Sequence, residues 1–276
     1  MLFASDLDRT LIYSNKFLDK KEREDVRLIE TKGDKEISFM TNKAIDKLKK
    51  LSQNICFVPT TTRTIEQYKR ISIFQSEIKS KYAVVSNGGN IIIDNKVDKI
   101  WNELIRNKMK NEAASIEDVL KKFNEIKNKE WLISCNTADE LFCYCIVDCD
   151  KFEQDSLSYF IEWLDMNNWN VSMQGRKIYF MPNCVNKRDA ILNIANNIGA
   201  KHIASAGDSY LDLSMLSIAD YAVSPLHGEI YNIYTNEKYE DIKLDFTLSS
   251  GILASEEILE NVEKFSNDKY IETALG

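Results

Sequence analysis

Two short acidic segments, each directly after an apolar run, constrain this chain more than any other feature of its sequence. The first, residues 6–10 (DLDRT), follows residues 2–4 (LFA), and the second, residues 207–212 (GDSYLD), follows residues 202–206 (HIASA). Each pattern is typical of a buried strand that ends in a polar turn. In open α/β sheets the chemistry lies beyond the carboxyl ends of the strands, and so we expect the two segments to meet at one edge.

Together the two segments bring four carboxylates to that edge, those of Asp6, Asp8, Asp208 and Asp212. Carboxylates at this density repel one another unless a cation lies among them. Mg²⁺ is the natural candidate because it prefers hard oxygen ligands. The sequence therefore favours a Mg²⁺-dependent enzyme that acts on a phosphate group, with these side chains as candidate metal ligands.

The composition narrows the class of partner. The chain has 276 residues and a formal net charge of −7, which disfavours nucleic acid or an anionic membrane as the main partner. No apolar run approaches the ~20 residues that span a bilayer, and no signal-peptide pattern opens the sequence. We therefore expect a cytoplasmic protein, with its oligomeric state left open.

The six cysteines include no Cys-x-x-Cys pair. Cys143 and Cys145 alternate along a predicted strand, and with Cys149 they leave a thiolate zinc site open as an alternative. Free thiols in a reducing compartment are the favoured interpretation.

The order of the predicted elements indicates two domains. Short buried strands alternate with helices at both ends of the chain, which predicts an α/β fold with a Rossmann-like parallel sheet. Between them, pairs of strands separated by helices predict an inserted α+β module at 88–184. Residues 1–87 and 185–276 would then form one domain that is split in sequence.

Local patterns predict several individual elements. Apolar runs on both sides of the turn at residues 32–35 indicate a β-hairpin. Thr41 is expected to cap a helix that runs through Leu51. In the insert, residues 90–94 and the region near Trp101 are predicted to be strands.

Four motifs in order carry a resemblance to a known family. They are residues 6–10, residues 60–63 (TTTR), the helix start at residues 186–190 (NKRDA) and residues 207–212. With the insert between the second and third motifs, the chain resembles the haloacid dehalogenase superfamily of phosphohydrolases, in its Cof-type, sucrose-phosphatase-like branch. The resemblance covers nearly the whole chain. It implies a parallel-sheet core and a Cof-type cap that closes over the active site and chooses the substrate. It also implies Mg²⁺-dependent hydrolysis of a phosphomonoester. The expected partner is thus a small phosphorylated metabolite, with a sugar phosphate favoured.

The resemblance also implies roles for individual residues. Asp6 would attack phosphorus and form an aspartyl-phosphate, while Asp8 would protonate the leaving oxygen and then deprotonate the attacking water. Lys187 would hold Asp6 and a phosphoryl oxygen, with Arg188 as the competing candidate. Mg²⁺ would be held through Asp6, Asp8 and Asp208, with Asp212 as a further ligand or as an anchor behind the ligands.

The remaining candidates come from the second motif, from the end of the strand before the insert and from the insert itself. Thr61 is the implied phosphate-binding hydroxyl, with Thr60 as the alternative, and Arg63 is an implied substrate contact. Asn87, at the end of a predicted strand, and Arg176, between two strands of the insert, are further candidate substrate contacts.

Two positions depart from the pattern of the branch. Thr62 stands where glycine is usual, and Arg9 stands where a small or neutral residue is usual. A β-branched residue restricts the backbone, so Thr62 bears on which threonine binds phosphate. Arg9 beside the nucleophile is expected to pair with the substrate or with a carboxylate of the cap.

Two other functions remain open on the sequence. A phosphomutase or phosphotransferase would use the same Asp6 and Asp8, and activation by a bisphosphate would distinguish it. A non-catalytic metabolite-binding regulator would bind Mg²⁺ without turnover, and the complete set of motifs disfavours it.

Overall fold

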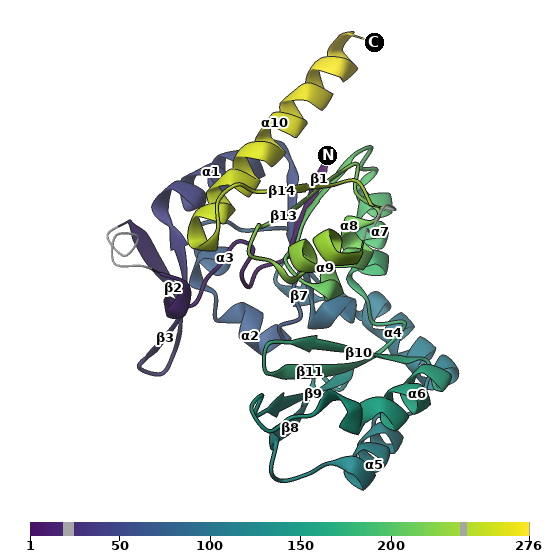
Figure 1. Ribbon diagram of the computed structural model, residues 1–276. Coiled ribbons are helices and arrows are strands. Elements are labelled where there is room, and N and C mark those ends of the chain that lie inside the picture. The colour runs from purple at the N-terminus through teal and green to yellow at the C-terminus, as the bar shows by residue number, and fades with distance from the viewer. Residues whose placement is uncertain (19–24, 238–241, 276) are drawn as a thin grey trace. The chain divides into compact units, whose positions relative to one another are not determined.

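The structure, a computed structural model, describes residues 1–18, 25–237 and 242–275. The chain forms two compact units, shown as a ribbon in Figure 1. The first consists of Met1–Lys96 and Lys187–Gly276, and the second of Val97–Asn186. The first unit is thus built from both ends of the sequence.

A five-stranded parallel sheet forms the centre of the first unit (Figure 1). Its strands lie in the order β14-β13-β12-β1-β4. Their bounds are β1 Leu2–Ser5, β4 Cys56–Pro59, β12 Ile203–Ala206, β13 Tyr221–Ser224 and β14 Leu244–Phe246. Because β1 lies between β4 and β12, residues far apart in sequence meet where these strands end. The α/β fold class and the parallel sheet are confirmed.

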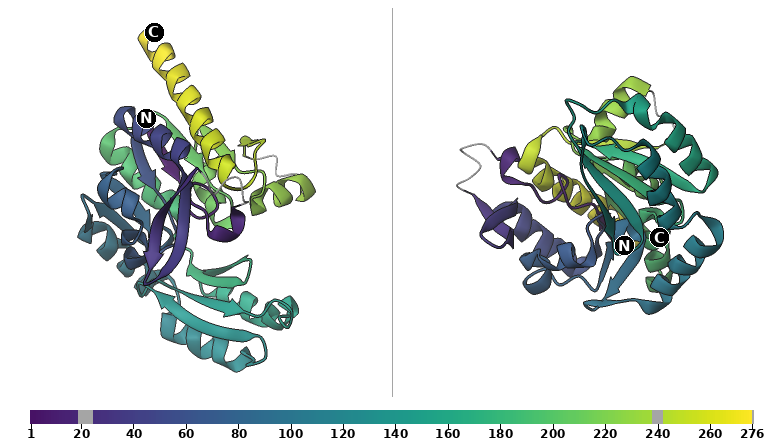
Figure 2. Two further views of the ribbon diagram at one scale, coloured as in Figure 1. Left: turned by 90° about the vertical axis from the view of Figure 1, so that its left-hand side faces the viewer. Right: turned by 90° about the horizontal axis from the view of Figure 1, so that it is seen from below.

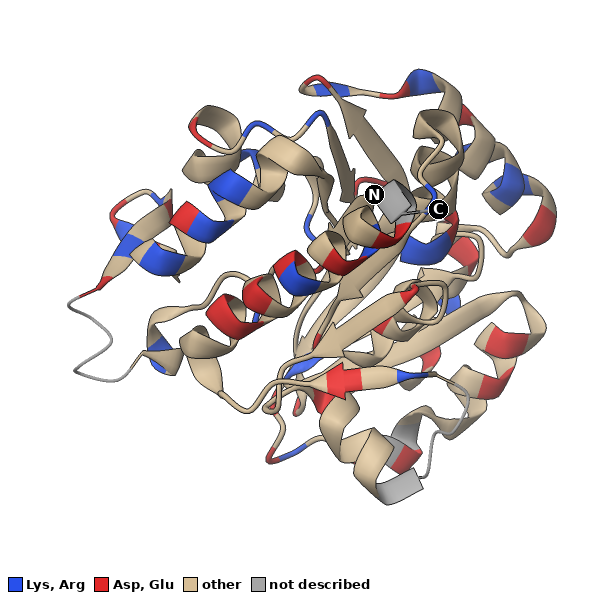
Figure 3. Cartoon of the chain, turned by 90° about the horizontal axis from the view of Figure 1, so that it is seen from above, with Lys and Arg blue, Asp and Glu red and all other residues tan. Residues whose placement is uncertain are grey.

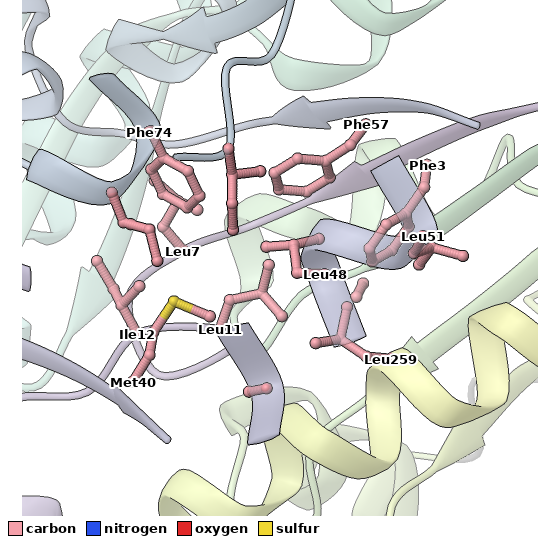
Figure 4. Close-up of a cluster of buried hydrophobic side chains, with 14 of the residues drawn as sticks. Phe3, Leu7, Leu11, Ile12, Met40, Leu48, Leu51, Phe57, Phe74 and Leu259 are labelled. Carbon is pink, nitrogen blue, oxygen red and sulfur yellow. The ribbon is translucent and has the colours of Figure 1, made fainter. Parts of the chain in front are cut away.

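One face of this sheet packs against α1 (Asn42–Asn54) and α10 (Ala254–Leu275). Figure 4 shows the cluster of buried side chains between them, including Phe3 and Phe57 from the strands and Leu48 from α1. Removing each such side chain from water contributes about 1.5–3 kcal/mol. The opposite side carries α7 (Lys187–Ile198) and α8 (Leu213–Leu216), and Leu216 lies in a separate cluster with Ala222.

The predicted helix after Thr41 is confirmed. The Thr41 side chain accepts a hydrogen bond of 3.0 Å from the backbone N–H of Ala44, and this caps the first turn of α1. Its buried residues follow the helical repeat: Ala44, Ile45, Leu48 and Leu51.

A hairpin of β2 (Val26–Lys32) and β3 (Lys35–Thr41) stands beside this core, as predicted from the turn at residues 32–35. A further small sheet has the order β5-β6-β7. The other elements of the first unit are η1 Asn15–Phe17, α2 Ile65–Lys69, α3 Ser72–Ser76, β5 Tyr82–Val85, η3 Ser86–Gly88, β6 Asn90–Ile93, β7 Lys96–Val97, η5 Tyr210–Asp212, α9 Glu229–Glu237 and η6 Gly251–Leu253.

The second unit has an antiparallel sheet in the order β10-β11-β9-β8 with helices of its own. Phe123, Phe160 and Phe180 lie at the centre of its hydrophobic core. Its elements are α4 Lys99–Glu112, α5 Ile116–Ile126, β8 Leu132–Ala138, β9 Phe142–Val147, η4 Gln154–Leu157, α6 Ser158–Met166, β10 Trp169–Gln174 and β11 Lys177–Pro182.

The predicted strand near Trp101 is wrong, because Lys99–Glu112 is the helix α4. The Asp98 side chain accepts hydrogen bonds from the N–H groups of Ile100 and Trp101 and so starts the helix. Trp101 and Ile105 are the buried residues of α4, and their spacing of one helical turn puts them on the same face.

The start of the second unit differs from the predicted module of 88–184. Residues 88–96 fall in the first unit, where β6 pairs with β5 in an antiparallel ladder. The predicted boundary at residue 88 falls in the turn between these strands.

Charged side chains lie mainly on helices and loops, and Figure 3 shows few on the strands. The C-terminal half of α10, yellow in Figure 2, extends away from the sheet of its own unit. Among the described helices, none is both long and apolar enough to cross a membrane.

Candidate active site

The loop after β1 places Asp6 at the end of the central strand. The Asp6 N–H donates to the carbonyl of Ala206 on β12, 2.8 Å away. Leu7 and Leu11 anchor the loop in the core cluster of Figure 4, and the Leu7 carbonyl accepts from the N–H of Leu11 at 2.9 Å. The Asp6 side chain is buried, and Thr10 Oγ1 donates to its Oδ2 at 3.3 Å.

Lys187 is the first residue of α7, and its side chain is buried. Nζ donates to Asp6 Oδ1 at 2.7 Å and to Asp212 Oδ1 at 2.6 Å. Burial lowers the pKa of Lys187, but the charges of Asp212 and Asp6 outweigh it, so the pKa is raised and the ammonium persists. Arg188 is exposed, and so Lys187 is the cation that joins the two acidic motifs.

The second acidic segment forms a tight turn around Asp212. Its Oδ2 accepts from the N–H of Asp208 at 3.1 Å and from the N–H and Oγ of Ser209 at 2.9 and 2.8 Å. This packing needs glycine at position 207, because a Cβ there would lie 2.4 Å from the Asp212 Cβ. The turn fixes the direction of the buried Asp208 carboxylate.

Three carboxylates converge on one position. Asp6, Asp208 and Asp212 each place an oxygen within 4.8 Å of the others, the one such group among the described residues. Burial, and next the charges of Asp6 and Asp212, raise the pKa of Asp208 well above its ordinary value. Burial likewise raises the pKa of Asp6 to about 7, although Lys187 lowers it.

This group suits Mg²⁺. One lysine lies between Asp6 and Asp212, and the raised pKa values of Asp6 and Asp208 indicate a shortage of positive charge that a further cation would supply. Asp6 and Asp208 are the candidate ligands. Asp212 accepts four hydrogen bonds, one from Lys187 and three within its own turn, whereas Asp6 accepts two, and so Asp212 serves as an anchor. The cysteines form no comparable group within the described part of the chain, so the zinc alternative has no support.

Asp8, predicted as a fourth ligand, lies outside the group of three. Its carboxylate forms a two-point ion pair with Arg63, with Nε to Oδ2 at 2.6 Å and Nη2 to Oδ1 at 2.8 Å. Burial lowers the pKa of Arg63, but the charges and hydrogen bonds of Asp8 and Glu30 raise that pKa by more, and the net shift is upward. Arg63, predicted as a substrate contact, thus contacts the proposed acid/base residue.

The second motif follows β4, and both candidate threonines are buried. Thr60 Oγ1 donates to the carbonyl of Val58 at 3.0 Å, whereas Thr61 Oγ1 accepts from the N–H of Arg63 at 3.2 Å. Thr62 is not among the described residues with positive φ, so its backbone does not need the glycine of the resembled branch.

The two remaining candidates lie in different units. Asn87 is buried in η3 with φ of 55°, and its N–H donates to the Thr61 carbonyl at 3.0 Å, so the first unit holds it beside the second motif. Arg176 is exposed in the turn between β10 and β11 of the second unit, and its role stays a prediction.

Solved structures share this fold. Sucrose-phosphatase from Synechocystis sp. PCC6803, solved with sucrose and phosphate, has a TM-score of 0.69 at 15% identity, over 96% of this chain and 98% of that one. The haloacid dehalogenase subclass IIB sugar phosphatase BT4131 has a TM-score of 0.64 at 12% identity, over 96% and 98%. A Thermoplasma acidophilum protein has a TM-score of 0.62 at 14% identity, over 95% and 97%.

Sequence comparison adds the family. None of the curated proteins compared with the chain matches it. The model of the haloacid dehalogenase-like hydrolase family matches residues 102–224, a range that ends in β13 and includes Lys187, Asp208 and Asp212. Over these residues the chain is similar to haloacid dehalogenase-like hydrolases.

Arg9 extends the site. Its φ is 64°, its Nη1 lies 3.5 Å from Asp208 Oδ2, and its Nη2 donates to the His227 carbonyl at 2.9 Å. His227 Nδ1 accepts from the Gly251 N–H at 3.1 Å, which leaves Nε2–H to donate to the Arg9 carbonyl at 3.0 Å. Burial lowers the pKa of His227, in keeping with a neutral ring. Arg9 therefore pairs with a carboxylate of its own unit.

Sequence reasoning missed Glu30, which joins the candidate site from β2. Its carboxylate is buried and contacts Arg63 Nη1 at 2.6 Å. The sequence did contain a signal for Glu30, because this charged residue directly follows the apolar pair Leu28 and Ile29. A charged side chain is buried in a strand only when it has a partner.

Proposed function

We propose that the chain hydrolyses a small phosphomonoester, with sugar phosphates as the favoured class, through an aspartyl-phosphate on Asp6 and with Mg²⁺ as cofactor. The observation that supports this most is the buried Lys187 that bridges Asp6 and Asp212 beside Asp208. A carboxylate attacks a phosphate dianion only when nearby cations offset the repulsion.

The residues divide the reaction between them. Asp6 Oδ forms the bond to phosphorus, and Lys187 holds the Asp6 carboxylate in place. Asp8, two residues on, donates a proton to the leaving oxygen and then accepts one from the attacking water. Mg²⁺, held by Asp6 and Asp208, would supply positive charge to the transferring phosphoryl group.

The proposed substrate class is based on the similarity to solved structures. Two of the proteins with this fold are a sucrose-phosphatase and a sugar phosphatase. We assign substrate choice to the second unit, as the inserted cap, and Arg176 is its candidate contact to an anionic substrate group.

The test is release of inorganic phosphate from sugar phosphates, nucleotides and an aryl phosphate, with and without Mg²⁺. We expect Mg²⁺-dependent release that the isosteric Asp6→Asn change abolishes, while Arg188→Ala, at the exposed neighbour of Lys187, retains it. Release that persists in Asp6→Asn would contradict the proposal. Transfer to a second substrate after activation by a bisphosphate would instead indicate a mutase.

A further inference from the structure

Glu30 is a buried carboxylate that the proposed reaction does not use. Its side chain has no exposed surface, yet it lies on a strand of the hairpin rather than in the sheet. It contacts Arg63 Nη1 at 2.6 Å, Arg70 Nε at 3.3 Å and Ser38 Oγ at 2.7 Å. Two guanidinium groups and a hydroxyl offset the cost of burying this charge.

The backbone of β2 is irregular where it presents Glu30. Leu28 is opposite Phe39 and Glu30 is opposite Ser38, so the register shifts between them, and it shifts again before Thr31. Such bulges turn a side chain in a new direction and recur beside active sites. Here the bulge puts Glu30 and Ser38 in contact with the same guanidinium.

The bulge is fixed to the segment after α2. Glu30 forms an isolated antiparallel bridge with Ile71, and Ser72 Oγ donates to the Ile29 carbonyl at 2.9 Å. The position of Glu30 is thus set by the core of the first unit rather than by the hairpin alone.

Arg63 links Glu30 to Asp8. Its Nη1 donates to Glu30, its Nη2 donates to Ser38 Oγ at 3.2 Å, and its remaining edge forms the two-point pair with Asp8. The Asp8 side chain is 51% exposed, whereas that of Arg63 is 11% exposed. A half-exposed carboxylate samples several rotamers in water, and a planar guanidinium fixed at its far edge selects one of them.

We propose that Glu30 is a positioning residue for the reaction: it holds Arg63, and through Arg63 it sets the direction of the Asp8 carboxyl group. The inference rests on the proposed function, in which Asp8 is the acid and base. In the first step Asp6 bonds to phosphorus, the ester P–O bond breaks, and the Asp8 proton goes to the leaving oxygen. In the second step a water oxygen bonds to phosphorus, the Asp6–phosphorus linkage breaks, and the water proton goes to Asp8.

An aryl phosphate separates the two steps. An aryl oxide leaves without a proton, so misplacement of Asp8 spares the first step and slows the second. We therefore expect Glu30→Gln to release aryl alcohol in a burst of about one per site and then turn over about 10- to 100-fold more slowly than the native protein. Ser38→Ala, which keeps the charge of Glu30, should show the same pattern more weakly.

The matched control is Glu77→Gln. Glu77 also joins the hairpin to the rest of the unit, through Arg27 of β2 and Lys49 of α1, but it is exposed and its ion pairs are with these two side chains. It should leave burst and steady-state rates near native values. If Glu30→Gln lowers both phases equally, or changes neither, Glu30 only supports the fold and the proposal is overturned.

A second readout does not depend on turnover. In the native protein Arg63 Nε–H donates to Asp8, and we expect a slowly exchanging Nε–H resonance in nitrogen-15 spectra, identified by its absence in Arg63→Lys. Glu30→Gln should shift it and speed its exchange. If the native protein hydrolyses nothing, the proposed function fails. An Arg63 Nε–H resonance that is unchanged in Glu30→Gln would separately overturn the positioning role.

Discussion

At the scale of single residues, one ammonium group links the two ends of the sequence. Lys187 contacts Asp6 and Asp212 at less than 3 Å, and all three side chains are buried. A buried charge is tolerated only with its partners in place, so the same contacts that arrange the reaction also support the fold.

We expect Lys187→Met to lower the free energy of unfolding by about 3–5 kcal/mol, because two buried carboxylates lose their cation. It should also abolish phosphate release. Denaturant unfolding measures the first effect, and Arg188→Met, a change of the same kind at an exposed position, is its control. Adding Asp212→Asn to Lys187→Met should recover part of the lost stability. If Lys187→Met alone is as stable as the native protein, the buried carboxylates do not depend on Lys187.

The sequence indicated Asp6, Lys187, Asp208 and Asp212, which lie together in the structure, because each stands in a motif at the end or start of an element. The sequence did not predict the pairing of Arg63 with Asp8 and Glu30, since no local pattern joins residues so far apart. Contacts of this kind depend on how the elements pack.

At the scale of elements, local signals worked where a cap or a turn was explicit. The hairpin around residues 32–35 and the helix after Thr41 were predicted, whereas the bulge at Glu30 was not, because register is a property of two strands. The predicted strand near Trp101 is instead the helix α4, and two local signals favoured the helix: Asp98, a good N-cap residue, precedes it, and Trp101 and Ile105 share one face.

We expect Asp98→Ala to destabilise α4 by about 0.5–2 kcal/mol, because the N–H groups of Ile100 and Trp101 lose their acceptor. Hydrogen exchange of the α4 amides should quicken, while the amides of α1 in the first unit should not change. Asp98→Asn keeps an acceptor and should cost less. Equal exchange in Asp98→Ala and the native protein would show that packing of Trp101 alone holds the helix.

At the scale of the whole molecule, stability and cation binding are coupled through the same carboxylates. Burial raises the pKa of Asp6 to about 7, well above the value of about 3.9 in an unfolded chain. Between these values the folded protein holds a proton that the unfolded chain has lost. This contribution to stability is complete below about pH 4 and disappears as the pH rises through about 7.

We therefore expect the free energy of unfolding of the metal-free protein to fall from pH 5 to pH 8. Mg²⁺ should stabilise the protein more at pH 8 than at pH 5, because protons compete for the same oxygens. Unfolding in denaturant at several pH values, with and without Mg²⁺, measures both effects. Asp6→Asn should flatten the metal-free profile, and a stability that instead rises over this range would contradict the role of burial.

The split of the first unit in sequence has a consequence for synthesis. β1 is made early, but its neighbour β12 follows about two hundred residues later, which takes ~10–40 s at the usual rate of translation. During that interval Asp6 has neither Lys187 nor Asp208 beside it. The second unit is continuous in sequence and is complete before β12 emerges. On the ribosome, the insert is thus available to fold first, and the reaction site can form only when the last strands arrive.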